Sequence, residues 1–379
     1  MVDKKELREG IFISRVNRFV CECVIDGKRV FAHLPNSGRL LEILFKGVKI
    51  YALRISGKSI LQYRLIFAEK EGMPILIDTN LTNIIAKHLI EKNMIPSLKG
   101  YSVSKKEVSL EGNRFDLLLE RAQEKLIIEV KNSTLFWKSL SMFPDCETKR
   151  GKKHIEGLVK AKDDKTDCGI LFIVSSPKVT HFLPDFHNDY AFSKELLKAK
   201  DVIRVYAICV GFDSDFSISE VKEIKIPWEV LAEVGEDSGA YLLIMNVSEN
   251  RNLLIGAIGE KFLRKGYYVY VGSARKNLKN RISRHFKRQK KLHWHIDFLT
   301  INFRPFFVFP VRAQESYECE IAYELSKISD WSILAFGSSD CSCETHLFGF
   351  ENNPMDSLEF INLLLYFRMG ILEKQLQNN

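Results

Sequence analysis

The spacing of the apolar residues changes near residue 80, and no other feature of the sequence constrains the fold as strongly. Up to residue 67, apolar and polar residues alternate in short runs, and the dipeptide Asp26-Gly27 separates the runs 19–25 and 28–34. Alternation on both sides of such a dipeptide is typical of a β-hairpin. From Asn80 onward, apolar residues recur at helical spacing. We therefore expect an N-terminal β-barrel over residues 1–79, whose further strands cover 47–54 and 59–66, and a domain with helices after it.

The middle of the chain alternates helical and strand patterns. Helices are expected over residues 81–90, 149–161 and 191–200, and strands over 101–110, 114–120, 125–131, 169–175 and 202–210. This order, αβββαβ with a trailing strand, indicates a mixed α/β (α+β) domain over residues 80–228. Residues 229–238 contain four acids and no base, and we interpret this segment as a linker.

A third domain is expected over residues 239–350. The predicted strands cover residues 239–247, 253–258 and 267–271, and the predicted helices cover 277–289 and 317–328. The C-terminal segment, residues 351–379, contains an amphipathic helix over 357–375. That helix would pack either on the body of the protein or on a second subunit. The sequence therefore leaves open whether the protein forms a homo-oligomer.

The net charge of +8 is concentrated in one segment, residues 275–291, which we call the basic segment. It carries nine Lys or Arg residues and no acid, so the rest of the chain is nearly neutral. A polyanion such as nucleic acid is the favoured partner, because a run of phosphates meets many cations at once. A solvated helix face is the alternative.

The cysteines and the apolar runs indicate a cytoplasmic protein with free thiols and no membrane span. Of the eight cysteines, four form two CxC pairs, and the first residues are charged. No apolar run approaches the ~18 residues that a membrane span needs. Cys341, Cys343 and His346, with His293 or His295 as a fourth ligand, could hold Zn²⁺. The alternative is a polar turn with buried thiols.

One constellation of charged residues lies on a predicted hairpin. If the turn centres on residues 121–124, Asp116 faces Glu129, and cross-strand neighbours have Cβ atoms ~4.5–5.5 Å apart. Lys131 lies on the same strand face as Glu129. Two carboxylates can hold Mg²⁺, which activates a water, and the lysine can orient that water. An ordinary cross-strand salt-bridge cluster is the alternative.

The first ~228 residues carry several motifs in one order. They are Arg18-Phe19, His33-Leu-Pro-Asn-Ser-Gly-Arg39, Glu107-Val108, Arg114-Phe-Asp116, Glu129-Val-Lys131 and Phe143-Pro-Asp145-Cys-Glu-Thr-Lys-Arg-Gly151, followed by His154. Together they resemble the SfsA (sugar fermentation stimulation) family, with the Asp-x12-Glu-x-Lys pattern of PD-(D/E)XK nucleases. The resemblance implies an N-terminal OB-like barrel, a nuclease-like domain and nucleic-acid binding.

The same resemblance implies roles for single residues. Asp116 and Glu129 would bind Mg²⁺ or Mn²⁺, and Lys131 would be the catalytic lysine. Glu107 would add a carboxylate or be a surface residue, and Asp145 would shape the site. Three further residues are phosphate candidates: Arg150 and His154, where a helix begins, and, more weakly, Arg39 at the barrel edge.

The C-terminal part has a second set of motifs. Gly239-Ala-Tyr241 and Tyr270-Val-Gly272 resemble the two triplets of the GIY-YIG nuclease fold, and the likeness extends over about residues 235–350. It implies that Tyr241 and Tyr270 take part in base chemistry on a water. The remaining candidates are Arg281 for the phosphate, Glu318 or alternatively Glu320 or Glu324 for the metal, His285 and His295 as alternative bases, and Arg284, Lys287 and Arg288 for the nucleic-acid backbone.

These patterns converge on a metal-dependent nuclease that hydrolyses DNA or RNA phosphodiesters and carries a second GIY-YIG-like module. Two alternatives stand beside it. One is a non-catalytic DNA-binding regulator that retains the nuclease folds. The other is hydrolysis of a small molecule on the GIY-YIG-like scaffold, because a fold does not dictate a function.

Overall fold

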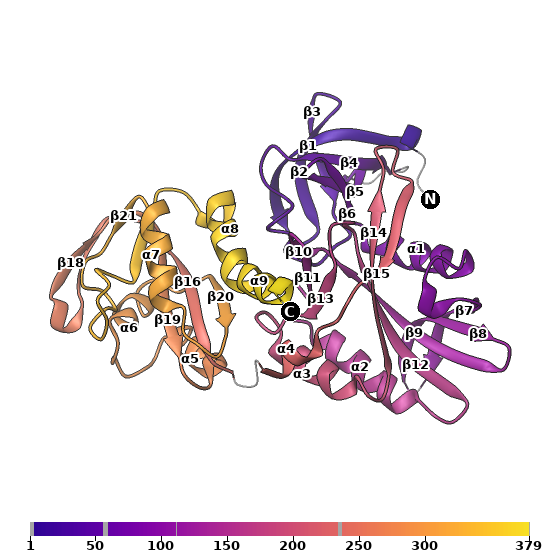
Figure 1. Ribbon diagram of the computed structural model, residues 1–379. Coiled ribbons are helices and arrows are strands. Elements are labelled where there is room, and N and C mark those ends of the chain that lie inside the picture. Colours follow the sequence, from indigo (N-terminus) through magenta and orange to yellow (C-terminus); the bar gives the residue numbers. More distant parts are fainter. Residues whose placement is uncertain (1–3, 56–59, 111, 234–236, 379) are drawn as a thin grey trace. The chain divides into compact units, whose positions relative to one another are not determined.

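The computed structural model describes residues 4–55, 60–110, 112–233 and 237–378. The chain divides into two compact units, Met1–Leu231 and Ala232–Asn379 (Figure 1). Among the described residues, no helix has the length and apolar character that crossing a membrane requires.

The N-terminal unit begins with a six-stranded sheet. Its strands are β1 (Leu7–Asn17), β2 (Val20–Ile25), β3 (Lys28–His33), β4 (Lys49–Arg54), β5 (Tyr63–Lys70) and β6 (Met73–Leu76). The order is β3-β2-β1-β4-β5-β6, and an additional pairing of β3 with β5 closes the sheet. The predicted OB-like barrel is therefore confirmed.

The predicted hairpin turn of the barrel is also present. Asp26 and Gly27 both have positive φ, 52° and 72°, as a two-residue turn between twisted strands requires. The strand expected over residues 59–66 begins later, at Tyr63, and residues 56–59 lie outside the described residues.

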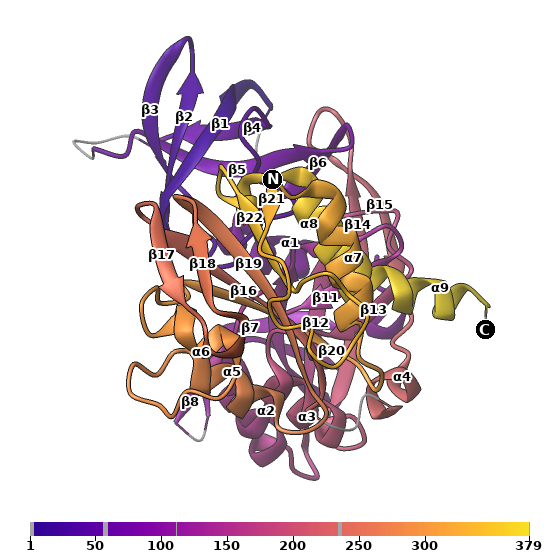
Figure 2. The same ribbon diagram turned by 90° about the vertical axis from the view of Figure 1, so that its left-hand side faces the viewer.

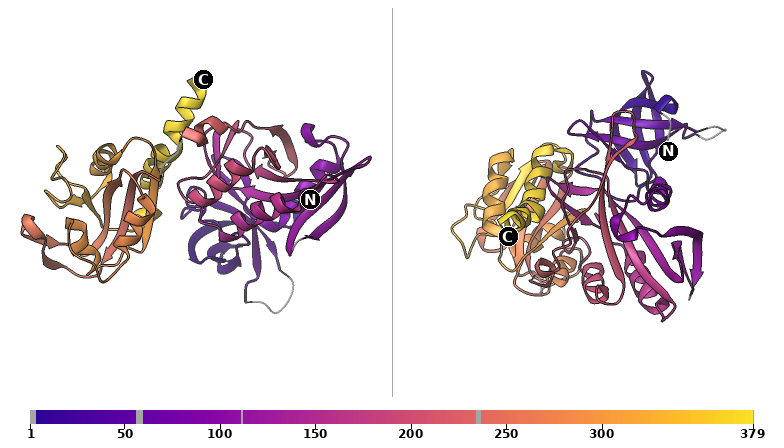
Figure 3. Two further views of the ribbon diagram at one scale, coloured as in Figure 1. Left: turned by 90° about the horizontal axis from the view of Figure 1, so that it is seen from below. Right: turned by 45° about the vertical axis from the view of Figure 1, so that its right-hand side comes forward.

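A second six-stranded sheet forms the middle of this unit, in the order β15-β14-β12-β9-β8-β7 (Figure 3). Its strands are β7 (Ser102–Leu110), β8 (Asn113–Arg121), β9 (Glu124–Ser133), β12 (Thr166–Val174), β14 (Arg204–Phe212) and β15 (Ile218–Glu223). Its helices are α1 (Thr79–Glu91), α2 (Lys149–Ala161) and α3 (Tyr190–Ala199). The expected αβββαβ order is confirmed. A small sheet that the sequence did not predict consists of β10 (Leu135–Trp137), β11 (Leu140–Phe143) and β13 (His181–Pro184).

The two faces of this sheet have separate cores. Ile85 and Leu89 of α1 belong to one core with Leu126 and Ile128, so the apolar face predicted for β9 is buried there. Ile155 and Leu158 of α2 belong to the other core, and so do Phe115, Ile127 and Phe172. Along β9, Ile127 therefore faces one core and its neighbours Leu126 and Ile128 face the other, as the alternation of side chains along a strand requires.

The expected linker is partly ordered. Helix α4 covers Trp228–Glu233, so the first half of the acidic segment 229–238 is helical. Val230 and Leu231 are buried, and these apolar contacts explain why this part folds. Residues 234–236 lie outside the described residues.

The C-terminal unit has a five-stranded sheet of order β20-β16-β19-β22-β21 and a separate hairpin, β17–β18 (Figure 2). The sheet strands are β16 (Gly239–Val247), β19 (Gly266–Ala274), β20 (Phe307–Arg312), β21 (Trp331–Ser332) and β22 (Leu347–Phe350). The hairpin strands are β17 (Arg251–Leu254) and β18 (Glu260–Leu263). The prediction of a strand over residues 253–258 is wrong for its second half, because Gly256–Ile258 forms a 3-10 turn.

Four helical segments complete this unit. They are α5 (Leu278–His285), α6 (His295–Thr300), α7 (Glu318–Ile328) and a C-terminal helix made of α8 (Leu358–Leu365), a π-helical turn (Tyr366–Gly370) and α9 (Ile371–Asn378). The helix expected over 277–289 ends earlier, at His285. The C-terminal helix, yellow in Figure 3, packs on its own unit, where the ring of Phe360 lies 6.1 Å from that of Phe309.

Candidate functional site

The hairpin of β8 and β9 has the predicted register. Leu117 pairs with Ile128, and Asp116 precedes Leu117. The Asp116 carboxylate accepts hydrogen bonds from the Val130 backbone N–H at 2.8 Å and from the Asn83 amide at 2.7 Å. Asn83 lies on α1 and was missed from the sequence, because no spacing rule relates a helix residue to a strand 33 residues away.

The Glu129 side chain is buried, with 3% of it exposed. Its Oε1 contacts both Lys131 Nζ and His154 Nδ1. Its Oε2 is buried and has no hydrogen-bond partner among the described residues. Burial would raise the pKa of Glu129, but His154 and Lys131 outweigh burial and hold that pKa below its usual value. Glu129 is therefore a carboxylate with one oxygen left for a ligand.

The Asp116 carboxylate is held in a less favourable environment. Burial and, after it, the charge of Glu129 raise its pKa above the usual value. Asp116 thus has a raised pKa and Glu129 a lowered one. A cation between two neighbouring carboxylates offsets their repulsion and favours the charged form of both. The pair meets the donor preference of a hard divalent ion, which takes carboxylate oxygens.

A cavity of about 620 Å³ opens beside these carboxylates. Asp116, Glu129 and Lys131 line it together with Arg18 and Arg150. With Lys149, Asp145 and Glu147, which also line it, four cations and four acids share this cavity. Such a mixture can hold a phosphate and a metal ion side by side.

Several predicted residues of this unit lie elsewhere. The Glu107 side chain is 68% exposed and forms an ion pair with Arg114, and it does not line the cavity. His154 is buried against Glu129, so it supports the carboxylate instead of facing a phosphate. The Arg39 guanidinium donates a hydrogen bond to Asn188 at 3.2 Å and does not line the cavity. Arg18 is the barrel arginine that lines it.

Asp145 connects the barrel to the cavity wall. Its carboxylate accepts the backbone N–H groups of Arg39 at 2.7 Å and of Leu40 at 3.3 Å. Gly38 lies so close that an added Cβ would be 2.4 Å from an Asp145 oxygen. Only glycine fits there, so the carboxylate and this barrel loop shape the cavity together.

The C-terminal unit has its own cavity, of about 720 Å³. The predicted residues Tyr241, Tyr270, Arg281 and Glu318 line it, and so do His285 and His295. Gly272 is required on the neighbouring strand, because a Cβ there would lie 2.5 Å from the Tyr241 hydroxyl. This contact explains the glycine of the Tyr270-Val-Gly272 motif.

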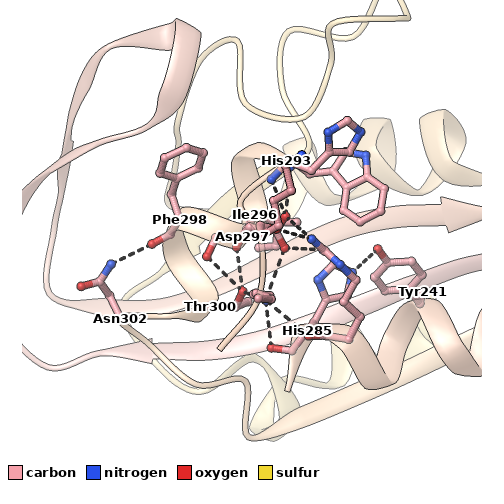
Figure 4. A network of polar contacts seen from close by, with 12 residues as sticks. Tyr241, His285, His293, Ile296, Asp297, Phe298, Thr300 and Asn302 are labelled. Carbon is pink, nitrogen blue, oxygen red and sulfur yellow. Dashed lines mark hydrogen bonds and ion pairs between the residues drawn. The ribbon is translucent and has the colours of Figure 1, made fainter. Parts of the chain in front are cut away.

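A hydrogen bond of 2.7 Å joins Tyr241 Oη to His285 Nε2 (Figure 4). Burial raises the pKa of both Tyr241 and Tyr270, so both phenols are protonated at neutral pH. Burial and the charge of Lys290 lower the pKa of His285 to about 3. His285 is therefore neutral and can accept a hydrogen bond from the phenol.

Asp297 lies at the centre of the network in Figure 4 and takes two cations of the basic segment. Arg284 reaches it with two hydrogen bonds of 2.6 and 2.9 Å, and Lys290 lies 3.3 Å away. The prediction that Arg284 faces nucleic acid is thus contradicted, because this guanidinium neutralises a fully buried acid. Lys287 and Arg288 are exposed.

Glu318 and Glu320, two glutamates proposed as metal ligands, lie in different places. Glu318 lines the cavity and contacts the Ser273 hydroxyl, whereas Glu320 is exposed and lies outside the lining.

The predicted cysteine and histidine cluster is present, with one correction. Cys341, Cys343 and His346 meet Cys319, and the ligand atoms of all four lie within 4.8 Å of one another. The fourth member is therefore Cys319 and neither His293 nor His295. His295 Nδ1 instead accepts the Gly337 N–H at 3.1 Å.

Three family models match this chain. Residues 13–77 match "SfsA N-terminal OB domain", residues 80–216 match "Sugar fermentation stimulation protein RE domain", and residues 240–366 match "Domain of unknown function DUF123".

Similar proteins include sugar fermentation stimulation protein homologs. The one from Caldanaerobacter subterraneus subsp. tengcongensis is 33% identical over 57% of this chain and 95% of its own length. The one from Pyrobaculum arsenaticum is 39% identical over 50% of this chain and 81% of its own length. A solved structure, Pyrococcus furiosus SfsA in complex with Ca²⁺, is 29% identical, covers 59% of this chain and 97% of its own, and has a TM-score of 0.56.

Proposed function

This chain belongs to the sugar fermentation stimulation protein (SfsA) family, and on that basis we propose that its N-terminal unit is a divalent-metal-dependent nuclease for DNA or RNA. The observation that carries the proposal is the buried, unpartnered Oε2 of Glu129 next to Asp116. Lys131 contacts only Oε1 of Glu129, so Oε2 is a buried polar atom that a metal ion would satisfy.

The residues fit a hard divalent ion, Mg²⁺ or Mn²⁺. Asp116 and Glu129 would hold it through carboxylate oxygens. The Ca²⁺ complex of the Pyrococcus furiosus relative supports a divalent site in the family. When bound, such an ion lowers the pKa of a water and stabilises charge on a phosphoryl oxygen.

The surrounding side chains would prepare the reaction. Lys131, which contacts Glu129 Oε1, would orient the attacking water and offset the charge of the scissile phosphate. Arg18 and Arg150 line the cavity and would bind the flanking phosphates, since guanidinium groups match phosphate geometry. His154 and Asn83 would keep the two carboxylates in place.

The barrel would guide a single strand toward this cavity. Phe19 and Phe31 are 45% and 47% exposed, and aromatic faces on OB-type barrels stack with bases. These two residues are therefore our candidates for the groups that stack with bases. A nucleic-acid substrate is consistent with a cytoplasmic protein.

The test is cleavage of labelled single- and double-stranded DNA and RNA by the full chain, with Mg²⁺ or Mn²⁺ and with EDTA. We expect metal-dependent products. In protein that also carries Tyr241→Phe, so that the C-terminal cavity does not contribute, we expect Asp116→Asn and Glu129→Gln each to lower the rate at least ~100-fold, because each removes a ligand charge. Glu107→Gln is the matched control, since that acid lies outside the cavity.

No cleavage of any of the four substrates would contradict the proposal. If Asp116→Asn protein also bound DNA with unchanged affinity, a non-catalytic DNA-binding regulator would take its place. Salt dependence of binding cannot separate the two functions, because both need phosphate contacts.

A second candidate activity belongs to the C-terminal unit. The Tyr241–His285 hydrogen bond favours it, because it pairs a phenol with a neutral base inside a cavity that also holds Arg281 and Glu318. Tyr241 would help to activate a water, Arg281 would bind the phosphate, and Glu318 would hold a second metal ion. Residual cleavage by the Asp116→Asn protein tests this activity.

A further inference from the structure

Four side chains with soft metal-binding atoms converge in the C-terminal unit. Cys319 lies in the first turn of α7, and Cys341, Cys343 and His346 come from residues 333–346, between β21 and β22. The four ligand atoms lie within 4.8 Å of one another. A tetrahedral zinc site with Zn–S bonds of ~2.3 Å has ligand atoms about 3.8 Å apart. The cluster is therefore close to the dimensions that a single ion requires.

The His346 ring is oriented as a metal ligand would be. It is 2% exposed, and its Nε2 lies 3.5 Å from Cys341 Sγ. Its Nδ1 lies 3.3 Å from Glu318 Oε1 on the other side. Metal-bound histidines usually carry a carboxylate or carbonyl on the second ring nitrogen. The ring thus has a thiol side and a carboxylate side.

The segment that supplies three of the four groups is anchored near its two ends, by bonds such as Ala335 N–H to the Glu344 carbonyl at 2.9 Å, and has no regular secondary structure. Residues 333–346 contain neither helix nor strand. Long connections of this kind are uncommon in compact domains and usually have a function. Backbone hydrogen bonds such as His346 N–H to the Phe336 carbonyl, at 2.8 Å, hold only parts of it. A metal ion would tie this segment to α7 through Cys319.

We propose that Cys319, Cys341, Cys343 and His346 bind one structural Zn²⁺ ion. Thiolates and imidazole select zinc over Mg²⁺, Mn²⁺ and Ca²⁺, which prefer oxygen ligands. Four protein ligands complete a tetrahedron and leave no position for a substrate, as in structural sites. Because Glu318 precedes Cys319 and faces His346, the ion also fixes the position of this cavity carboxylate. The site is separate from the nuclease proposal, since its occupancy needs no nucleic acid.

The test is the metal content of the full chain, purified under reducing conditions without chelator and measured by mass spectrometry. We expect one zinc per chain, and less than a fifth of that in Cys341→Ser and Cys343→Ser. Cys146→Ser is the control and keeps one zinc, because that half-buried thiol belongs to the other unit. A chain that holds no zinc, holds iron instead, or has a disulfide among these cysteines overturns the proposal.

A second measurement covers the case in which a serine variant does not fold. In the Co²⁺-substituted protein, thiolate ligands give strong near-ultraviolet charge-transfer absorption and tetrahedral visible bands. His346→Cys keeps four ligands, so it should retain one metal per chain while the charge-transfer band grows. An unchanged spectrum would exclude His346 as a ligand and overturn the four-residue site. Failure of the cleavage assay would leave both measurements unaffected.

Discussion

Glu129 and His285 are both buried, and burial favours the neutral form of each, yet the neighbours of Glu129 keep it charged whereas Lys290 helps to keep His285 neutral. At Glu129, burial favours the neutral acid, and contacts with His154 and Lys131 outweigh it. At His285, burial and the Lys290 charge both favour the neutral ring. The first residue therefore carries a charge that can bind a cation, and the second is a neutral ring that can accept a hydrogen bond from Tyr241. The chemistry proposed at each site follows from this difference.

The His285 shift predicts how the stability of the C-terminal unit depends on pH. The folded pKa of about 3 lies below the ordinary value of 6.5, so between these values only the unfolded chain binds the proton. The free energy of unfolding should then fall as the pH falls from 6.5, by up to ~1.4 kcal/mol per pH unit for one proton. His285→Gln should flatten this slope.

Urea unfolding of the full chain at several pH values between 7 and 4 measures that slope. His293→Gln is the matched control, because His293 is exposed in the same unit. Equal slopes for wild type and His285→Gln would show that this ring does not resist protonation.

At the scale of elements, the basic segment has two different sides. Its helix α5 is shorter than expected, and Arg284 and Lys290 turn inward to Asp297. Arg281 stacks on Trp294, with its guanidinium carbon 4.0 Å from the ring centre. Arg275, Lys287 and Arg288 are exposed. The charge run therefore combines an internal ion-pair network with a surface that can meet phosphates.

Replacing Arg275, Lys287 and Arg288 by glutamine should weaken nucleic-acid binding in a salt-dependent way. Each lost phosphate contact reduces the slope of log K against log salt by ~0.9 for duplex DNA, so the triple change should reduce it by up to ~2.7. Fluorescence anisotropy with labelled duplex at several salt concentrations measures the slope.

The control is the triple change of Arg251, Lys265 and Arg304 to glutamine. These cations are also exposed in the same unit but lie outside the basic segment. If both triple variants change the slope alike, binding depends on net charge and not on this surface.

At the scale of the whole molecule, the two units are self-contained. The N-terminal unit has two cores on the faces of its central sheet, and the C-terminal unit has a core of its own. Each cavity is lined by residues of one unit. The homologs from Caldanaerobacter and Pyrobaculum align over only about half of this chain. We propose the limits 1–79, 80–228 and 239–350 for the three domains.

Separate cavities predict independent activities. Asp116→Asn should remove one cleavage activity and Tyr241→Phe the other, and the double variant should lose both. Rates with single- and double-stranded substrates measure this in a double-mutant cycle, where distant sites without shared partners give additive effects. Full loss of cleavage in Asp116→Asn alone would mean that the C-terminal cavity does not cut these substrates.

The sequence by itself determined the features that depend on neighbours along the chain. The Asp26-Gly27 turn, the helices over 79–91 and 149–161, and the register of β8 with β9 follow from local spacing and turn chemistry. The grouping of Asp116 with Glu129 and Lys131 could be predicted from the sequence for the same reason, because one hairpin carries all three.

Only the tertiary structure decided which distant side chains complete each site. Asn83, His154 and Cys319 reach their partners across elements that are far apart in sequence. Arg284 was misjudged because its charge suggested solvent, whereas the fold places a buried aspartate beside it. Spacing along a chain fixes faces and registers, but packing sets burial and contacts between elements, and those decide which charges and ligands are available.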